Sequence, residues 1–142
     1  MYEDSKYHNI IFLGKLSDGK IHYATKHGIV ELNGRKAFRG DVAGNNKSYG
    51  VNFRNPESEK IVVFEAVIDM MSYFEIEKQI KTKCKDNLLA LGMMVDLPLE
   101  TFLNENKQIR EIVLKLDHDE KGMEAMENLE EKYKGKGFLI ER

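Results

Sequence analysis

The chain has one cysteine, two prolines and no hydrophobic run long enough to cross a membrane. The single cysteine, Cys84, excludes an internal disulfide and a zinc site built from several cysteines, and it fits a reducing compartment. The longest apolar region, residues 61–74, is interrupted by Glu65 and Asp69. The start of the chain is polar and does not resemble a secretory signal. We therefore expect a cytoplasmic protein with no membrane partner.

The overall composition is ordinary, but the charged residues are distributed unevenly along the chain. The 142 residues are 42% hydrophobic and 32% charged, which is typical of a soluble globular protein with one sizeable core or two small ones. Residues 1–54 contain 9 basic and 5 acidic side chains, whereas residues 55–142 contain 13 basic and 19 acidic ones. This asymmetry suits a first part that holds a polyanion and a second part that holds cations, although a plain solvated surface explains it equally well.

The first third of the sequence is typical of β structure. Two β-prone runs, residues 10–16 and 20–25, flank a Ser-Asp-Gly turn and predict a hairpin. Recurring glycines further along indicate a small twisted sheet with tight connections. The polar segment Arg54–Lys60 contains a proline and is the best candidate boundary. We predict a basic β-rich segment over residues 1–55 and a second domain over residues 56–142.

The second part alternates between strand and helix patterns. The expected strands are residues 60–65, 87–92, 110–117 and 137–141, and the expected helices are residues 66–81, 98–106 and 120–135. Short continuous apolar runs are typical of strands that are buried on both faces. The alternation predicts an α/β fold with a parallel sheet and helices on both of its faces.

Acidic residues stand at the expected strand ends. Glu65 closes the first strand, and Asp117 and Asp119 close the third, so the three carboxylates converge if those strands are neighbours. A set of ligands made only of oxygen atoms favours Mg²⁺ or Mn²⁺ over zinc. Aspartates in such places also serve as turn residues or helix caps, a role for which Asp119 is well placed. Asp69 follows Glu65 by about one helical turn, where it can face the same edge or simply interact with the helix dipole.

These residues together resemble the Toprim domain, which bacterial replicative primases, topoisomerases and some nucleases share. The closest likeness is to the primase branch, over residues 60–142. The matching positions are Glu65 and Asp69, then Ala90-Leu91-Gly92, then Asp117, Asp119, Gly122 and Ala125. One departure is Ala66, where the family usually has glycine. Upstream, residues 34–53 are similar to an uncharacterised segment that precedes the module in proteins of plasmids and conjugative elements.

The resemblance implies phosphoryl or nucleotidyl transfer, or nucleic-acid handling, at a Mg²⁺ site. If the roles of the family's residues apply to this chain, Asp117 and Asp119 would be metal ligands. Glu65 would be the proton-transfer group or a further ligand, and Asp69 would be a supporting residue. The expected protein is a primase-like module for replication or transfer of mobile-element DNA, with DNA, nucleotides and other domains of a longer parent protein as partners. A Toprim nuclease, a non-catalytic DNA-binding or scaffold domain, and an acidic domain that recognises a protein partner are alternatives.

Basic residues of the first part are candidates for DNA contact. They are Arg35, Lys36, Arg39, Lys47 and Arg54. With Tyr49 and Phe53 as stacking rings, they would follow a phosphate backbone, and the lysines around Cys84 would add to them. The competing interpretation is a solvated charged surface with the aromatic side chains in the core.

Overall fold

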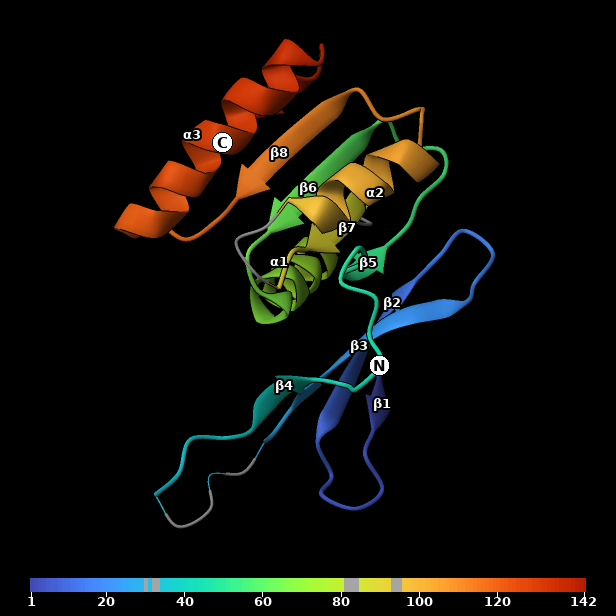
Figure 1. Ribbon diagram of the computed structural model, residues 1–142, viewed down its shortest axis with the longest axis vertical. Helices are drawn as coiled ribbons and strands as arrows, with labels where there is room; N and C mark the ends of the chain where they lie inside the picture. The colour runs from blue at the N-terminus through green and yellow to red at the C-terminus, as the bar shows by residue number, and fades with distance from the viewer. Residues whose placement is uncertain (30, 32–33, 81–84, 93–95) are drawn as a thin grey trace.

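The computed structural model describes residues 1–29, 31, 34–80, 85–92 and 96–142. Cys84 and the lysines at positions 81 and 83 lie outside the described residues. The chain forms two β-sheets, with the N-terminal sheet next to a larger sheet that carries the helices (Figure 1). None of the helices in the described ranges is long and apolar enough to cross a membrane.

The first sheet is antiparallel and contains the predicted hairpin. Its strands are β1 (Tyr2–Glu3), β2 (Ile10–Lys15), β3 (Ile21–His27) and β4 (Arg39–Asp41), in that spatial order. The turn between β2 and β3 places Gly19 at φ +80°, a conformation that side chains with a Cβ rarely adopt. The glycine of the Ser-Asp-Gly signal is therefore the residue that allows this tight connection.

The second sheet confirms the predicted strand–helix alternation. Its strands are β5 (Val51–Phe53), β6 (Lys60–Phe64), β7 (Asn87–Ala90), β8 (Glu111–Lys115) and β9 (Leu139–Glu141), in the order β5-β7-β6-β8-β9. Strands β6 to β9 are parallel, and only β5 is antiparallel, pairing with β7 at the edge. The parallel sheet predicted for residues 56–142 is therefore confirmed, and β5, from the sequence before Pro56, adds an antiparallel strand at its edge. The domain boundary at 55/56 stays a prediction.

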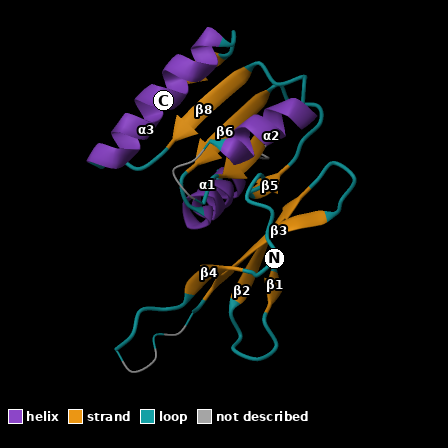
Figure 2. Ribbon diagram, viewed as in Figure 1, coloured by secondary structure: helices purple, strands orange, loops and turns teal. Residues whose placement is uncertain are grey.

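Helices cover both faces of the second sheet, as predicted (Figure 2). They are α1 (Val67–Gln79), α2 (Leu97–Glu105) and α3 (Glu120–Gly135). The side chains of α2 and α3 pack on one face against residues such as Ile61 and Ile112. On the other face, α1 and the first sheet share a core around Val62 and Leu88. Burial on both faces explains why β6 and β7 are continuous apolar runs instead of alternating ones.

The two sheets meet through backbone groups at glycines. A Cβ added at Gly14 of β2 would lie 2.3 Å from the carbonyl oxygen of Gly50, and one added at Gly50 would lie 2.3 Å from that of Ala90. Real Cβ atoms do not approach an oxygen so closely. The first sheet therefore rests directly on the backbone that leads into β5, and β5 rests on β7.

We predict that Gly14→Ala destabilises the protein by about 1–3 kcal/mol, because the added methyl group must push the two backbones apart. Urea denaturation followed by circular dichroism measures the change. Gly135→Ala is the matched control, since a Cβ at that position meets no atom within 4 Å and the position is helical. Equal stability of the two variants would show that the glycine contact does not constrain the joint.

Candidate functional site

The acidic site is built on two neighbouring parallel strands. Strand β6 pairs with β8 so that Phe64 lies opposite Lys115, and both strands end at the same edge of the sheet. Glu65 directly follows β6, and Asp117 comes two residues after β8. The Oε2 atom of Glu65 accepts a long hydrogen bond of 3.4 Å from the backbone N–H of Asp117. The structure thus brings together the two chain segments that the sequence placed at one edge.

A third segment holds Glu65 from the opposite side. The backbone N–H of Gly92 donates to the Glu65 carbonyl at 2.9 Å, and the N–H of Leu91 donates to that of Phe64 at 2.9 Å. Gly92 has φ +71°, which a residue with a Cβ rarely adopts. The Ala-Leu-Gly sequence at the end of β7 therefore fixes the backbone of Glu65 on the edge.

Asp119 caps a helix in the structure. It is the N-cap of α3, and its Oδ1 accepts a 2.8 Å hydrogen bond from the N–H of Gly122. The predicted strand ran through Asp117, but β8 ends at Lys115 and the chain bends at residues 118–119. The predicted strand is therefore two residues too long, and Asp117 and Asp119 stand in the bend before α3 instead of on an extended strand.

Glycine at position 122 is required by a close backbone approach. A Cβ there would lie 2.0 Å from the carbonyl oxygen of Asp117. The first turn of α3 is therefore folded directly against the acidic loop. The Asp-x-Asp-x-x-Gly spacing has a structural reason: the second aspartate caps the helix and the glycine makes room for the first.

Asp69 and Ala66 stand at the start of α1. Asp69 is exposed in the first helical turn, where a negative charge interacts favourably with the helix dipole. Ala66 is the N-cap, without a side-chain hydrogen bond, at φ −111° and ψ 152°. This is extended backbone that alanine adopts without strain, so the replacement of the family's usual glycine does not distort the strand end.

The acidic residues offer oxygen ligands in an accessible position. Asp117 and Asp119 are exposed and Glu65 is half-buried. Among the described residues, no group of three or more acidic, histidine or cysteine side chains is arranged to hold a metal ion. Mg²⁺ keeps several waters and is commonly bound through one or two carboxylates. The chemistry of Glu65 and Asp117 fits such a loosely held ion, with Asp119 partly committed to its cap.

Four of the five predicted DNA-contact residues are exposed, all from the first sheet and its loops: Arg35, Lys36, Arg39 and Lys47. Arg39 lies opposite His27 in the pairing of β3 and β4. Burial and the nearby charge of Arg39 lower the pKa of His27. His27 is therefore more readily neutral than an ordinary histidine, and the positive charge at this place belongs to Arg39.

Lys47 is held by a network that the sequence did not reveal. It forms an ion pair with Asp41, which also accepts a 2.6 Å hydrogen bond from the hydroxyl of Tyr23. Burial acts to raise the pKa of Asp41, but the bonds from Lys47 and Tyr23 outweigh it and lower the pKa. Burial and the same carboxylate raise the pKa of Tyr23. Tyr23 and Asp41 are far apart in the sequence, and only the strand pairing brings them together.

Arg54 lies inside the protein instead of on the basic surface. Its side chain is 16% exposed, pairs with Glu105 and donates at 3.3 Å to Oδ1 of Asn106. The guanidinium carbon also lies 4.9 Å from the ring centre of Phe102. These contacts attach the end of β5 to the end of α2. They engage Arg54 within the fold and remove it from the exposed basic surface.

Comparison with known proteins places these features in a family. Residues 62–142 match the family model described as Toprim-like. No curated protein matches the sequence significantly. The matched region contains the whole acidic edge, from β6 to β9.

Solved structures resemble the chain over a longer range. The primase fragment of the bacteriophage T7 primase-helicase protein superposes with a TM-score of 0.66 at 16% identity, covering 97% of this chain and 54% of that one. A structure of the T7 lagging-strand DNA polymerase interacting with primase domains gives a TM-score of 0.58 at 19% identity, covering 89% of this chain and 61% of that one. The likeness thus includes the N-terminal sheet, and this chain spans about half to three fifths of each matched chain.

The two roles of Asp119 are separable by substitution. Asparagine caps a helix as well as aspartate does, so we predict that Asp119→Asn keeps the stability of the protein while removing the charge. Asp119→Ala loses the bond to Gly122 and costs about 1 kcal/mol. Urea denaturation of the two variants measures the difference. If both variants lose the same stability, the carboxylate charge and not the cap supports α3.

Proposed function

The chain belongs to the Toprim-like family, and we propose that it is a Mg²⁺-dependent, primase-like nucleotidyl-transfer module of a protein that replicates or transfers mobile-element DNA. The observation that carries the proposal is the shared sheet edge, where Glu65 lies within hydrogen-bond reach of the Asp117 backbone and next to the Asp119 loop. The fold likeness to a primase fragment across 97% of the chain supports the primase branch.

In this proposal the acidic residues have distinct tasks. Asp117 and Asp119 would hold the ion, and a bound Mg²⁺ supplies positive charge against the phosphates of nucleotide and strand. Glu65, whose backbone is fixed by Gly92, holds or moves a proton at Oε2. Asp69 at the start of α1 adds negative charge to the same edge. The rigid strand ends keep these groups in place before any ligand arrives.

DNA and nucleotides are the proposed partners. The structure of the T7 polymerase with primase domains also contains an RNA/DNA hybrid and dTTP, which supports ligands of this chemistry for a chain of similar fold. The exposed cations Arg35, Lys36, Arg39 and Lys47 would contact the phosphate backbone. Other domains of a longer protein would complete the activity.

A non-catalytic DNA-binding or scaffold module is the second candidate function. One observation favours it: the described residues contain no group of three side chains arranged to hold a metal. Such a module would bind DNA without metal-dependent turnover. A Toprim nuclease shares the acidic edge with a primase, and the two are distinguished by assays of strand nicking and of primer synthesis.

Metal binding is the first test. We predict that calorimetric titration with Mn²⁺ or Mg²⁺ shows saturable binding that is lost in Asp117→Asn/Asp119→Asn, because the oxygen ligands lose their charge. Glu120→Gln is the control, since it removes an exposed carboxylate from the start of the same helix. A titration in the presence of a single-stranded oligonucleotide extends the test to a site completed by DNA.

The outcomes separate the two candidate functions. Binding that is lost in the double variant and retained in Glu120→Gln supports the metal-dependent module and justifies assays of primer synthesis and nicking. Absence of saturable binding with and without the oligonucleotide contradicts it and favours the non-catalytic module. Equal metal affinity of the double variant and the wild type would mean that the ion binds at a site other than Asp117 and Asp119.

DNA binding tests the basic surface. We predict that Lys36→Ala and Arg39→Ala each weaken binding to single-stranded DNA and reduce its salt dependence by about one counterion, because each removes a phosphate contact. Lys20→Ala is the control, since Lys20 is an exposed lysine of the turn between β2 and β3 that pairs with Asp18. Fluorescence anisotropy at several salt concentrations measures both effects. If the dependence of DNA affinity on salt concentration is unchanged in both variants, these cations do not contact DNA and belong to a solvated surface.

A further inference from the structure

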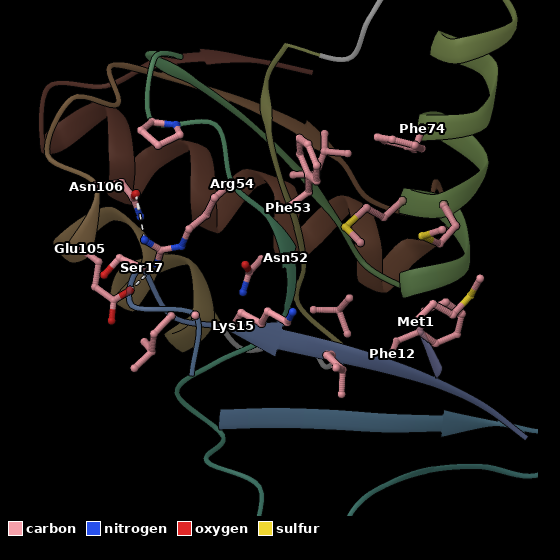
Figure 3. Close-up of a pocket in the computed structure, with 18 of the residues that line it drawn as sticks. Met1, Phe12, Lys15, Ser17, Asn52, Phe53, Arg54, Phe74, Glu105 and Asn106 are labelled. Carbon is pink, nitrogen blue, oxygen red and sulfur yellow. Dashed lines mark hydrogen bonds and ion pairs between the residues drawn. The ribbon is translucent and has the colours of Figure 1, made fainter. Parts of the chain in front are cut away.

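A cavity of about 770 Å³ lies between the β2–β3 hairpin and α1, with β5 as its floor (Figure 3). None of Glu65, Asp69, Asp117 and Asp119 is among the residues described as lining it. Its walls come from both sheets, because β2 contributes one side and α1 with β5 contributes the other. The cavity is therefore separate from the acidic edge and has the size of a small-molecule site.

One part of the cavity is aromatic. Phe53 of β5 remains 42% exposed, although Val51 on the same strand is buried. Its ring centre lies 5.7 Å from that of Phe74 in α1, with the two planes tilted by 57°. Because the two rings are tilted and not stacked in parallel, Phe74 does not cover the face of the Phe53 ring. A flat ligand ring can therefore pack on Phe53. Met70 and Met71 adjoin this part with flexible, polarisable side chains.

The other part of the cavity is polar and positively charged. Glu105 is the one acid among the described lining residues, and Arg54 neutralises it. Lys15 is exposed at the end of β2 and makes no ion pair with any of the described residues. Figure 3 shows Asn52 between Lys15 and Arg54, with Phe53 and Phe74 on the side of α1. The amide nitrogen of Asn52 donates to the carbonyl of Gly50 at 3.0 Å, which leaves its Oδ1 to accept from a ligand.

We propose that this cavity binds a nucleotide. Its base packs on Phe53 and its phosphate pairs with Lys15, while Asn52, which projects to the other face of β5, lies beside the polar part. Aromatic rings stack on any base, and the ammonium group of Lys15, which makes no ion pair with the described residues, is available to an anion. The net positive charge of the lining supports an anionic ligand over a neutral one. A half-open cavity of this size suits a small molecule better than the broad contact that a stable protein interface needs.

A nucleotide in this place would join the two sheets. It would contact Lys15 of the first sheet and Phe53 of the second at once, so binding would oppose their separation. We therefore expect the ligand to raise the unfolding temperature of the protein, by mass action on the folded state. This effect needs neither metal nor turnover and is independent of the proposed function.

The test uses dAMP as the probe for a free nucleotide and a deoxyadenosine oligonucleotide as the probe for a base within a strand. Both are titrated by calorimetry in EDTA against the Asp117→Asn/Asp119→Asn variant, so that the acidic edge cannot hold them through a metal. Phe53→Leu removes the stacking ring and keeps an apolar side chain, and Lys15→Gln removes the charge. Lys20→Gln is the control on the same hairpin, and circular dichroism checks that each variant is folded.

We expect each cavity substitution to weaken binding about tenfold and Lys20→Gln to leave it unchanged, in line with the usual strength of stacking on an aromatic ring. This pattern with dAMP supports a site for a free nucleotide. The same pattern with the oligonucleotide alone assigns the site to a base within a strand. No binding of either probe, or binding that neither cavity substitution weakens, overturns the proposal. Binding of an apolar dye in preference to both probes also overturns it and favours an apolar protein segment as the occupant.

Discussion

The structure depends on the parallel pairing of β6 with its neighbours β7 and β8. Because β6 is buried on both faces, its hydrogen bonds and its packing are satisfied only when a strand lies on each side and helices cover both faces. Parallel neighbours end at a common edge. The position of Glu65 beside the Asp117 loop and the Gly92 backbone is therefore a consequence of sheet pairing.

The sequence predicted the repetitive parts of the fold well. Helix α3 has the predicted bounds, residues 120–135, because a capping aspartate precedes it and glycines follow it. The hairpin and the buried strands were also predicted, since turn chemistry and apolar runs are local signals. The antiparallel pairing of β5 was not predicted, because three residues carry too little pattern to indicate their partner.

Side-chain partnerships over long range were the least accessible to prediction. Arg54 looks like a surface cation in the sequence, yet Glu105 and Asn106 draw it inside from α2. The Tyr23–Asp41–Lys47 network and the cavity above β5 depend on how the two sheets are placed together. For Asp119, the sequence allows both a metal ligand and a helix cap, and the structure shows the cap with the carboxylate still at the edge. Local chemistry thus identifies candidate groups, and topology decides which of them meet.

Strand β5 has a practical consequence for dividing the molecule. The region matched by the family model begins at residue 62, but β5 lies before it and covers the outer edge of β7. A fragment trimmed to the family region would leave the backbone groups of β7 unpaired, beside apolar residues such as Leu88 that the first sheet helps to bury. Exposed strand edges of this kind recruit other chains. An expression fragment that retains β5 would keep the edge of β7 paired, and one that also retains the first sheet would keep the core around Leu88 covered.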